Sequence, residues 1–126
     1  SDLFLIPSRY EPCGLTQMYS QRYGAIPVVR AVGGLDDTVE EFRPRSGRGT
    51  GFKFSESSPG ALVAAVRRGL AAWKNPEARR KLQRNGMSRD FSWKRSAEAY
   101  LGLYRALGGR NSEKLDLESH RGRETR

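Results

Sequence analysis

The feature that most constrains the fold is a short apolar run that is followed at once by a proline and a turn-rich loop. Leu3–Ile6 is continuously apolar rather than alternating, which is typical of a buried strand. Pro7 ends the strand because proline has no N–H to donate to a neighbouring strand. Leu15, Met18, Tyr19 and Tyr23 then recur at helical spacing and predict a helix from near Gly14 to Gly24. We expect Met18, Tyr19 and Tyr23 to face the core.

The same order of strand, loop and helix repeats along the chain. Ile26–Val29 predicts a second buried strand, and the alternating Gly51–Phe54 predicts a third. Between them, Asp36 or Asp37 could cap a short helix that runs through Phe42. This alternation predicts an α/β fold with a short parallel sheet, flanking helices and a C-terminal helical segment. Three strands make only half of a doubly wound, Rossmann-like domain, so we expect a partial domain.

Capping residues mark the later helices. Ser58-Pro59 and Asn75-Pro76 each place a side-chain acceptor before a proline at the first helical position. Ser92 could cap a last helix that begins at Trp93 and ends at Gly108-Gly109. We therefore expect one domain over residues 1–107. Residues 108–126 are mostly polar or charged, which predicts a disordered tail. The chain also starts without Met on a strand, so we expect it to be a fragment whose earlier strands precede Ser1.

The net charge of +9 raises the question of a nucleic-acid partner. Residues 1–60 carry seven basic and seven acidic side chains, whereas residues 61–107 carry eleven and three. The excess therefore lies on the later helices, where a charge run is usually a solvated face. We expect no nucleic acid partner and, since no apolar run approaches the length of a span, no membrane partner. A single cysteine excludes an internal disulfide and fits a reducing compartment. We expect a cytoplasmic location, or a plastid if the chain comes from a plant or alga.

The loop between the first strand and the first helix holds the residues with chemistry. Loops at the carboxyl ends of parallel strands are where ligands bind in open α/β sheets. Glu11 offers a carboxylate there that can accept hydrogen bonds from sugar hydroxyls. The free N–H groups at a helix start suit an anion such as a phosphate. The candidates for this role are Cys13, Gly14, Leu15 and Thr16.

Three sequence blocks carry a resemblance to a known family. They are Pro7–Gln17 (Pro-Ser-Arg-Tyr-Glu-Pro-Cys-Gly-Leu-Thr-Gln), Gly24–Arg30 and Gly33–Val39. In this order and spacing the chain resembles the C-terminal domain of glycogen and starch synthases over roughly residues 2 to 107. Those enzymes have two Rossmann-like domains, the GT-B architecture. They transfer glucose with retention from ADP-glucose to the non-reducing end of an α-1,4-glucan.

The resemblance implies the roles of several residues. Glu11 matches the glutamate that contacts the donor glucose and supports positive charge at the anomeric carbon. In related glycosyltransferases a second glutamate follows eight positions later, but here that position is Tyr19, as in glycogen synthases. A pair of carboxylates of the glycosidase kind is therefore not expected. The family chemistry is thought to be front-face, with the leaving phosphate helping to deprotonate the acceptor.

For other candidate residues the sequence allows more than one role. Gln17 could lie near the donor, and Gly33 and Gly34 could contact it or could only make a tight connection before a capped helix. Cys13 is not expected to act as a nucleophile, because the only histidine, His120, lies in the polar tail. The sequence lacks CxxC and HExxH motifs, so we expect no protein-bound metal, and we expect no cofactor because the nucleotide would be a substrate.

The resemblance also implies missing parts. The family's N-terminal domain supplies a Lys-x-Gly-Gly-type loop and a histidine near the donor sugar, and the adenine pocket lies upstream of Ser1. We therefore expect ADP-glucose, an α-1,4-glucan and the N-terminal domain of the same enzyme as partners, and no activity from this chain alone. Two alternatives remain, namely another retaining GT-B enzyme that uses UDP-glucose, such as a sucrose-type synthase, and a non-catalytic basic module that binds polyanions.

Overall fold

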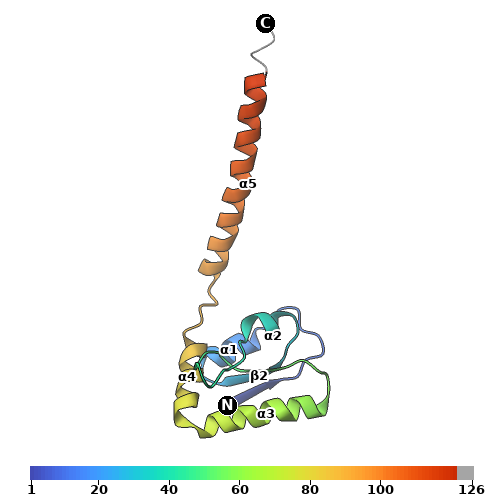
Figure 1. Ribbon diagram of the computed structural model, residues 1–126, viewed down its shortest axis with the longest axis vertical. Helices are drawn as coiled ribbons and strands as arrows, with labels where there is room; N and C mark the ends of the chain where they lie inside the picture. Colours follow the sequence, from blue (N-terminus) through green and yellow to red (C-terminus); the bar gives the residue numbers. More distant parts are fainter. Residues whose placement is uncertain (122–126) are drawn as a thin grey trace. The chain divides into compact units, whose positions relative to one another are not determined.

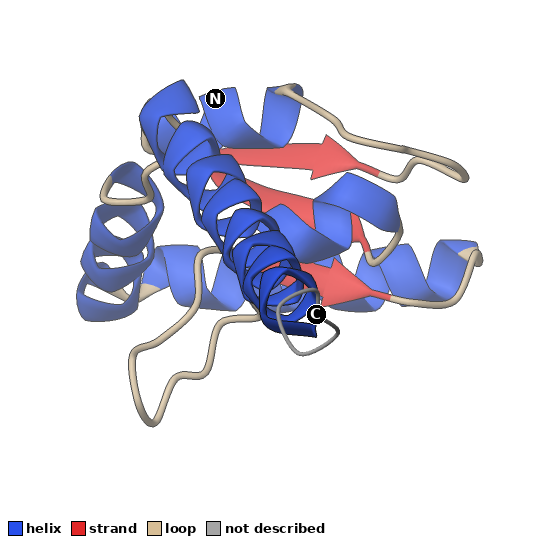
Figure 2. Cartoon of the chain, turned by 90° about the horizontal axis from the view of Figure 1, so that it is seen from above, coloured by secondary structure: helices blue, strands red, loops and turns tan. Residues whose placement is uncertain are grey.

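The computed structural model describes residues 1–121, and the chain divides into two compact units, Ser1–Arg89 and a second that begins at Asp90. The first unit contains a parallel sheet of three strands, which are β1 (Leu3–Ile6), β2 (Ile26–Arg30) and β3 (Phe52–Phe54). The strands lie side by side in that order and point the same way (Figure 2). The predicted fold class, a short parallel sheet with flanking helices, is confirmed.

Four helices flank the sheet, namely α1 (Thr16–Arg22), α2 (Gly33–Thr38), α3 (Pro59–Lys74) and α4 (Pro76–Met87). Figure 1 shows α1 and α2 on one face of the sheet and α3 on the other. The larger apolar core lies between the sheet, α3 and α4, and its buried members are Ile26, Val28, Phe42, Phe52, Phe54, Ala65 and Leu82. The smaller core lies under α2 and contains Ile6, Val29, Leu35 and Val39. The middle strand β2 is thus covered on both faces, as a parallel strand requires.

The predicted caps of α3 and α4 are confirmed. The Ser58 hydroxyl accepts a hydrogen bond from the backbone N–H of Ala61 at 3.2 Å. The Asn75 side chain accepts from the N–H groups of Glu77 and Ala78, at 3.0 and 3.1 Å. Each cap satisfies donors that have no partner inside the helix. Pro59 and Pro76 occupy the first position of α3 and α4, as the sequence indicates.

Helix α2 differs from the prediction. It begins at Gly33 and ends at Thr38, whereas a helix capped by an aspartate was expected to run through Phe42. No side chain caps its first turn, and Asp36 lies inside that turn. The helix begins earlier because the two glycines, which have no side chain to keep the backbones apart, lie directly against the loop that follows β1.

The buried face of α1 is the opposite of the one expected. Tyr19 and Tyr23 were assigned to the core, but their side chains are 58 and 86% exposed. The residues of α1 that are buried are the polar Gln17, Ser20 and Gln21. Helical periodicity alone could not settle this orientation, because hydrogen bonds from the two glutamine amides, rather than apolar contacts, attach α1 to α2.

The apolar side chains of α1 face outward beside the edge strand. Phe4 and Leu5 on β1 are 36 and 46% exposed, so the expectation that the whole strand is buried is wrong for this chain. Phe4, Thr16, Tyr19 and Tyr23 contribute to the lining of a cavity of about 300 Å³. Strand β1 is only partly covered because it pairs with a neighbouring strand on one side, β2.

The second unit contains helix α5, which spans Trp93–Arg121. The prediction that this helix ends at Gly108-Gly109 is therefore wrong. Glycine lowers helix propensity by about 1 kcal/mol relative to alanine but does not block the backbone hydrogen bonds. Residues 122–126 lie outside the described residues, and the division of the chain after residue 107, with a disordered tail, stays a prediction. Among residues 1–121, no helix is both long and apolar enough to cross a bilayer.

Candidate functional site

The loop between β1 and α1 lies at the carboxyl end of the sheet, and its backbone carbonyls accept hydrogen bonds from neighbouring elements. The Arg30 guanidinium, at the end of β2, donates to the carbonyl oxygen of Arg9 at 2.8 Å. The backbone N–H of Gly34, in α2, donates to the carbonyl oxygens of Glu11 and Pro12, both at 3.2 Å. Two neighbouring elements therefore fix the first half of the loop.

The buried side chain of Gln17 holds the second half of the loop. Its amide nitrogen donates to the carbonyl oxygens of Cys13 and Gly14, at 3.2 and 2.9 Å. The same nitrogen lies 3.0 Å from the Thr38 hydroxyl oxygen, and that hydroxyl donates to the carbonyl oxygen of Gly34. The Gln17 side chain is fully buried and supports the loop through these hydrogen bonds. Contact between Gln17 and a sugar-nucleotide donor stays a prediction.

The loop and the first residues of α1 present free N–H groups, because the first N–H groups of a helix have no partner inside it. The backbone N–H groups of residues 13–17 donate no hydrogen bond within residues 1–121. Cys13, Leu15 and Thr16 are exposed, and Gly14 has a φ of 64°, a left-handed conformation that favours glycine. Successive unpaired amides in such a turn form a concave site for an anion. The structure thus brings together the four residues that were proposed to bind phosphate.

Glu11 lies on the same loop, and its carboxylate is unpaired. Its side chain is half-buried, and within residues 1–121 its carboxylate makes neither a hydrogen bond nor an ion pair. The alternative in which Arg9 neutralises it is therefore not what the structure shows. A half-buried carboxylate without partners can accept hydrogen bonds from a bound ligand.

Gly33 and Gly34 shape the loop. A Cβ at Gly33 would lie 2.1 Å from the carbonyl oxygen of Glu11, and one at Gly34 would lie 1.9 Å from that of Cys13. Both distances are far below any real contact with a backbone atom. The close approach of two backbones therefore explains why glycine occupies these positions, and direct contact of either glycine with a substrate stays a prediction.

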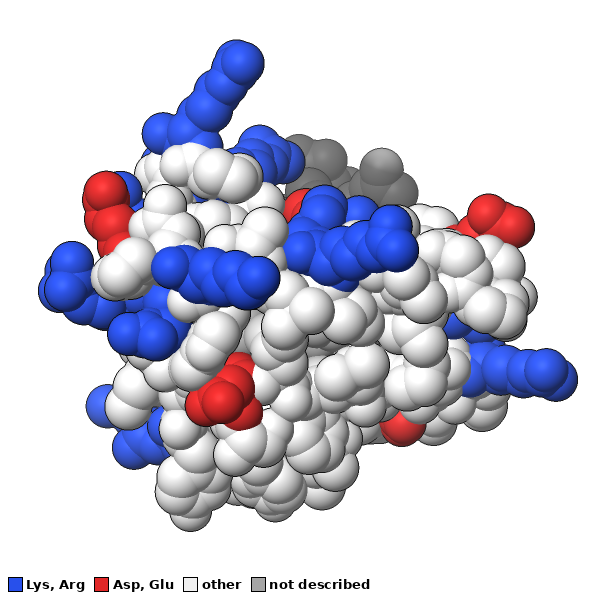
Figure 3. All heavy atoms as spheres, turned by 90° about the horizontal axis from the view of Figure 1, so that it is seen from below, with Lys and Arg blue, Asp and Glu red and all other residues white. Residues whose placement is uncertain are grey.

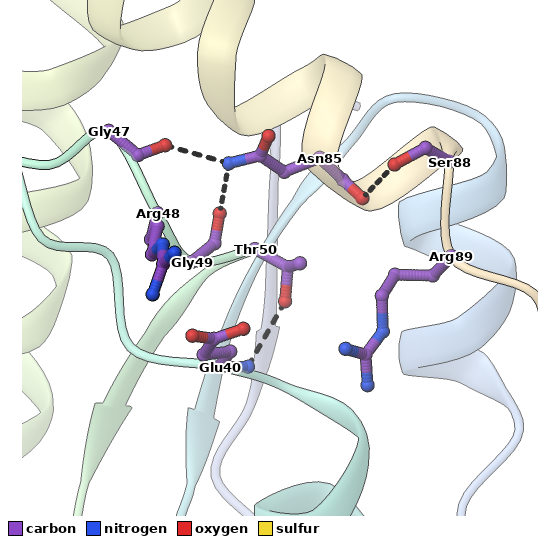
Figure 4. Close-up of a pocket in the computed structure, with 8 residues that line it drawn as sticks. All are labelled: Glu40, Gly47, Arg48, Gly49, Thr50, Asn85, Ser88 and Arg89. Atoms are coloured by element: carbon purple, nitrogen blue, oxygen red, sulfur yellow. Dashed lines mark hydrogen bonds between the residues drawn. The ribbon is translucent and has the colours of Figure 1, made fainter.

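A polar cavity of about 340 Å³ lies at the amino end of β3 (Figure 4). The Asn85 amide nitrogen donates there to the carbonyl oxygens of Gly47 and Gly49, both at 2.9 Å, and so ties α4 to the turn before β3. The lining residues are Glu40, Gly47, Arg48, Gly49, Thr50, Asn85, Ser88 and Arg89. None of the residues proposed as a site from the sequence belongs to this lining.

The basic residues of α3 and α4 are spread over the surface, and several are engaged. Figure 3 shows Lys and Arg side chains scattered over one face rather than gathered into one continuous patch. Arg79 lies over the Trp73 ring at 4.9 Å, and Lys81 pairs with Glu77 at 2.7 Å. Arg68 donates to the carbonyl oxygen of Lys53 at 2.6 Å. This arrangement favours a solvated helical face over a polyanion-binding surface.

Within the part of the chain that the structure describes, no group of three or more His, Cys, Asp or Glu side chains could hold a metal ion.

With the fold and the loop described, comparison with known proteins gives the family of the chain. The sequence model described as "Glycosyl transferases group 1" matches residues 1–89. The chain belongs to this family of glycosyltransferases.

The curated relatives of the chain include glycogen synthases. The chain is 63% identical over 107 residues to a glycogen synthase of Anaeromyxobacter sp. strain Fw109-5, which covers 85% of this chain and 22% of that protein. It is 57% identical over 104 residues to a glycogen synthase of Koribacter versatilis, covering 82% and 22%. The chain thus spans about a fifth of the length of these relatives. The resemblance to glycogen and starch synthases is confirmed.

Solved structures agree with the sequence relatives. The catalytic domain of starch synthase IV from Arabidopsis thaliana, bound to ADP and acarbose, is similar with a TM-score of 0.73 and 40% identity. The match covers 84% of this chain and 22% of that one. A sucrose-phosphate synthase from Thermosynechococcus elongatus is similar with a TM-score of 0.61 and 32% identity, covering 86% and 26%.

Proposed function

We propose that this chain is the donor-binding part of a glycogen or starch synthase that transfers glucose from ADP-glucose to the non-reducing end of an α-1,4-glucan. The observation that carries the proposal is the loop after β1. It combines the unpaired N–H groups of residues 13–17 with the uncommitted carboxylate of Glu11. The glycogen synthase relatives and the ADP in the starch synthase structure support the proposal.

The loop has two roles in the proposed reaction. As the glycosidic bond breaks, negative charge grows on the leaving phosphate, and the fixed amides of residues 13–17 stabilise it without having to reorganise. Glu11 accepts hydrogen bonds from the glucose hydroxyls and stabilises the positive charge that develops at the anomeric carbon. Tyr19 stands where a second glutamate would be, so no carboxylate of α1 is placed to act with Glu11. The resemblance then favours a front-face transfer with retention, in which the leaving phosphate takes the acceptor's proton.

The remaining partners are proposals as well. By the resemblance, the N-terminal domain of the same enzyme supplies the other wall of the donor site and contacts the glucan. We therefore predict that this chain alone incorporates no glucose from ADP-glucose into glycogen. The proposed reaction takes place in the cytoplasm, which stays a prediction from composition and relatives.

A UDP-glucose-dependent transferase is the second candidate, and the sucrose-phosphate synthase structure is the observation that favours it. Its lower identity and TM-score make it the weaker candidate. The loop itself would hold the pyrophosphate of either nucleotide sugar, so the donor has to be determined by assay.

The test is a chimera in which this chain replaces the matching 107-residue stretch of the glycogen synthase of Anaeromyxobacter sp. strain Fw109-5. We expect incorporation of glucose from ADP-glucose into glycogen at a rate within about tenfold of that of the intact host enzyme, because the exchanged segment supplies the same loop. The intact host enzyme and the host lacking the stretch are the controls. A folded chimera that transfers no glucose, or that prefers UDP-glucose, would contradict the proposal.

A further inference from the structure

We infer that Gln17 and Thr38 form a clamp that positions the phosphate-binding loop, with neither side chain touching the substrate. This inference deepens the proposed function and rests on it. The clamp is the chain of hydrogen bonds that runs from the Cys13 and Gly14 carbonyls through the Gln17 amide nitrogen and the Thr38 hydroxyl to the Gly34 carbonyl.

The clamp holds the carbonyl oxygens of two peptide groups in the loop. The N–H groups of the same two peptide groups are proposed to bind the phosphate. The peptide that joins Cys13 to Gly14 has its oxygen on Gln17 and its N–H unpaired, and the peptide that joins Gly14 to Leu15 is the same. A peptide group is planar, so fixing the direction of the oxygen fixes the direction of the N–H. Gln17 thus determines where two of the proposed phosphate donors point.

The packing around Gln17 leaves little room for another position of its side-chain amide. Gly14 has a positive φ, and a Cβ at that residue would lie 2.5 Å from the Gln17 side-chain oxygen. The Gln17 side chain is fully buried and its nitrogen faces three acceptors, so the orientation of the amide is set by its surroundings. The side-chain oxygen of Gln17 has no partner within residues 1–121.

The chain offers a matched control one turn further along α1. Gln21 is also buried, and its amide nitrogen also reaches α2, through the Thr38 carbonyl oxygen at 3.2 Å. Its other acceptor is the carbonyl oxygen of Gln17 at 3.3 Å, and its side-chain oxygen is likewise unpaired within residues 1–121. Gln21 makes no contact with the loop carbonyls. The two glutamines therefore resemble each other in burial and in attachment to α2, and differ in whether they hold the loop.

The experiment compares Gln17→Met with Gln21→Met in the chimera. Both variants lose a buried amide of similar shape, so we expect similar falls in melting temperature. Gln17→Met should raise the KM for ADP-glucose and the inhibition constant for ADP by about tenfold, with the KM for glycogen within about twofold. Gln21→Met should leave all three constants within about twofold. Thr38→Val should raise the KM for ADP-glucose and the inhibition constant for ADP by less than Gln17→Met does. Thr38→Ser keeps the hydroxyl and should restore donor affinity.

A second measurement does not depend on activity. Trypsin cleavage after Arg9, followed by mass spectrometry of the chimera, requires several residues on either side of Arg9 to open locally, and that stretch reaches the Cys13 carbonyl that Gln17 holds. It should be at least about threefold faster in Gln17→Met than in Gln21→Met. Equal cleavage rates, or equal changes in donor KM for the two glutamines, would overturn the clamp. An unmodified chimera that does not use ADP-glucose would contradict the proposed function instead, and the cleavage rates would then decide the clamp by themselves.

Discussion

Replacing Glu11 by Gln in the chimera should lower kcat by about 10³-fold, which corresponds to roughly 4 kcal/mol in the activation free energy. The substitution keeps the shape of the side chain and removes its charge. The carboxylate has no partner within residues 1–121, so its loss should not disturb the fold. The deficit should appear in kcat more than in the KM for ADP-glucose, because charge at the anomeric carbon is greatest in the transition state.

Glu40→Gln is the matched control for this prediction. Glu40 is an exposed acid in the cavity at the amino end of β3, so it lies outside the loop (Figure 4). Its replacement should leave kcat within about twofold, as surface substitutions away from a site usually do. A Glu11→Gln enzyme with an unchanged kcat would remove the role assigned to that carboxylate.

Gly34→Ala should lower the free energy of unfolding by about 3 kcal/mol, at the upper end of the usual range for overpacking. The added Cβ would lie 1.9 Å from the carbonyl oxygen of Cys13, which is backbone and cannot turn away. Either α2 or the loop must move. Donor affinity should therefore fall together with stability, and chemical denaturation combined with ADP inhibition in the chimera measures both.

Gly60→Ala provides the comparison within the same fold. Gly60 lies in the first turn of α3, and a Cβ there would meet no atom within 4 Å. Alanine favours a helix over glycine, so stability should stay the same or rise by up to about 1 kcal/mol. If Gly34→Ala proved as harmless as Gly60→Ala, the close packing of α2 against the loop would be wrong.

The parts of the fold that local chemistry determines were predictable from the sequence. A side-chain acceptor before a proline fixes a helix start without help from the rest of the chain, and Ser58 and Asn75 both do so as expected. The three strands were found for a similar reason. The first two are apolar runs, the third alternates, and turn residues bound each of them. What periodicity could not reveal was the orientation of α1. Its apolar stripe predicted a buried Tyr19 and Tyr23, whereas buried amide hydrogen bonds decide which face packs.

The candidate site was predictable in its position but not in its construction. Glu11 and the residues from Cys13 to Thr16 lie on one loop, as a strand-to-helix junction requires. Their amides are free because they lie at a helix start, as the sequence indicated. The hydrogen bonds that Arg30 and Gly34 donate to the loop carbonyls are tertiary, and no local pattern brings these residues to the loop. For the same reason, the sequence suggested Gln17 as a ligand contact and gave no sign of its bond to Thr38.

The most direct test of the central claim is the crystal structure of the chimera with ADP bound. We predict that oxygens of the distal phosphate lie 2.7–3.2 Å from at least two backbone nitrogens of residues 13–17, the range of ordinary N–H···O hydrogen bonds. The carboxylate of Glu11 should face the space where the glucose of the donor would lie. A phosphate bound elsewhere, with these amides still unpaired, would contradict the claim that this loop is the donor site.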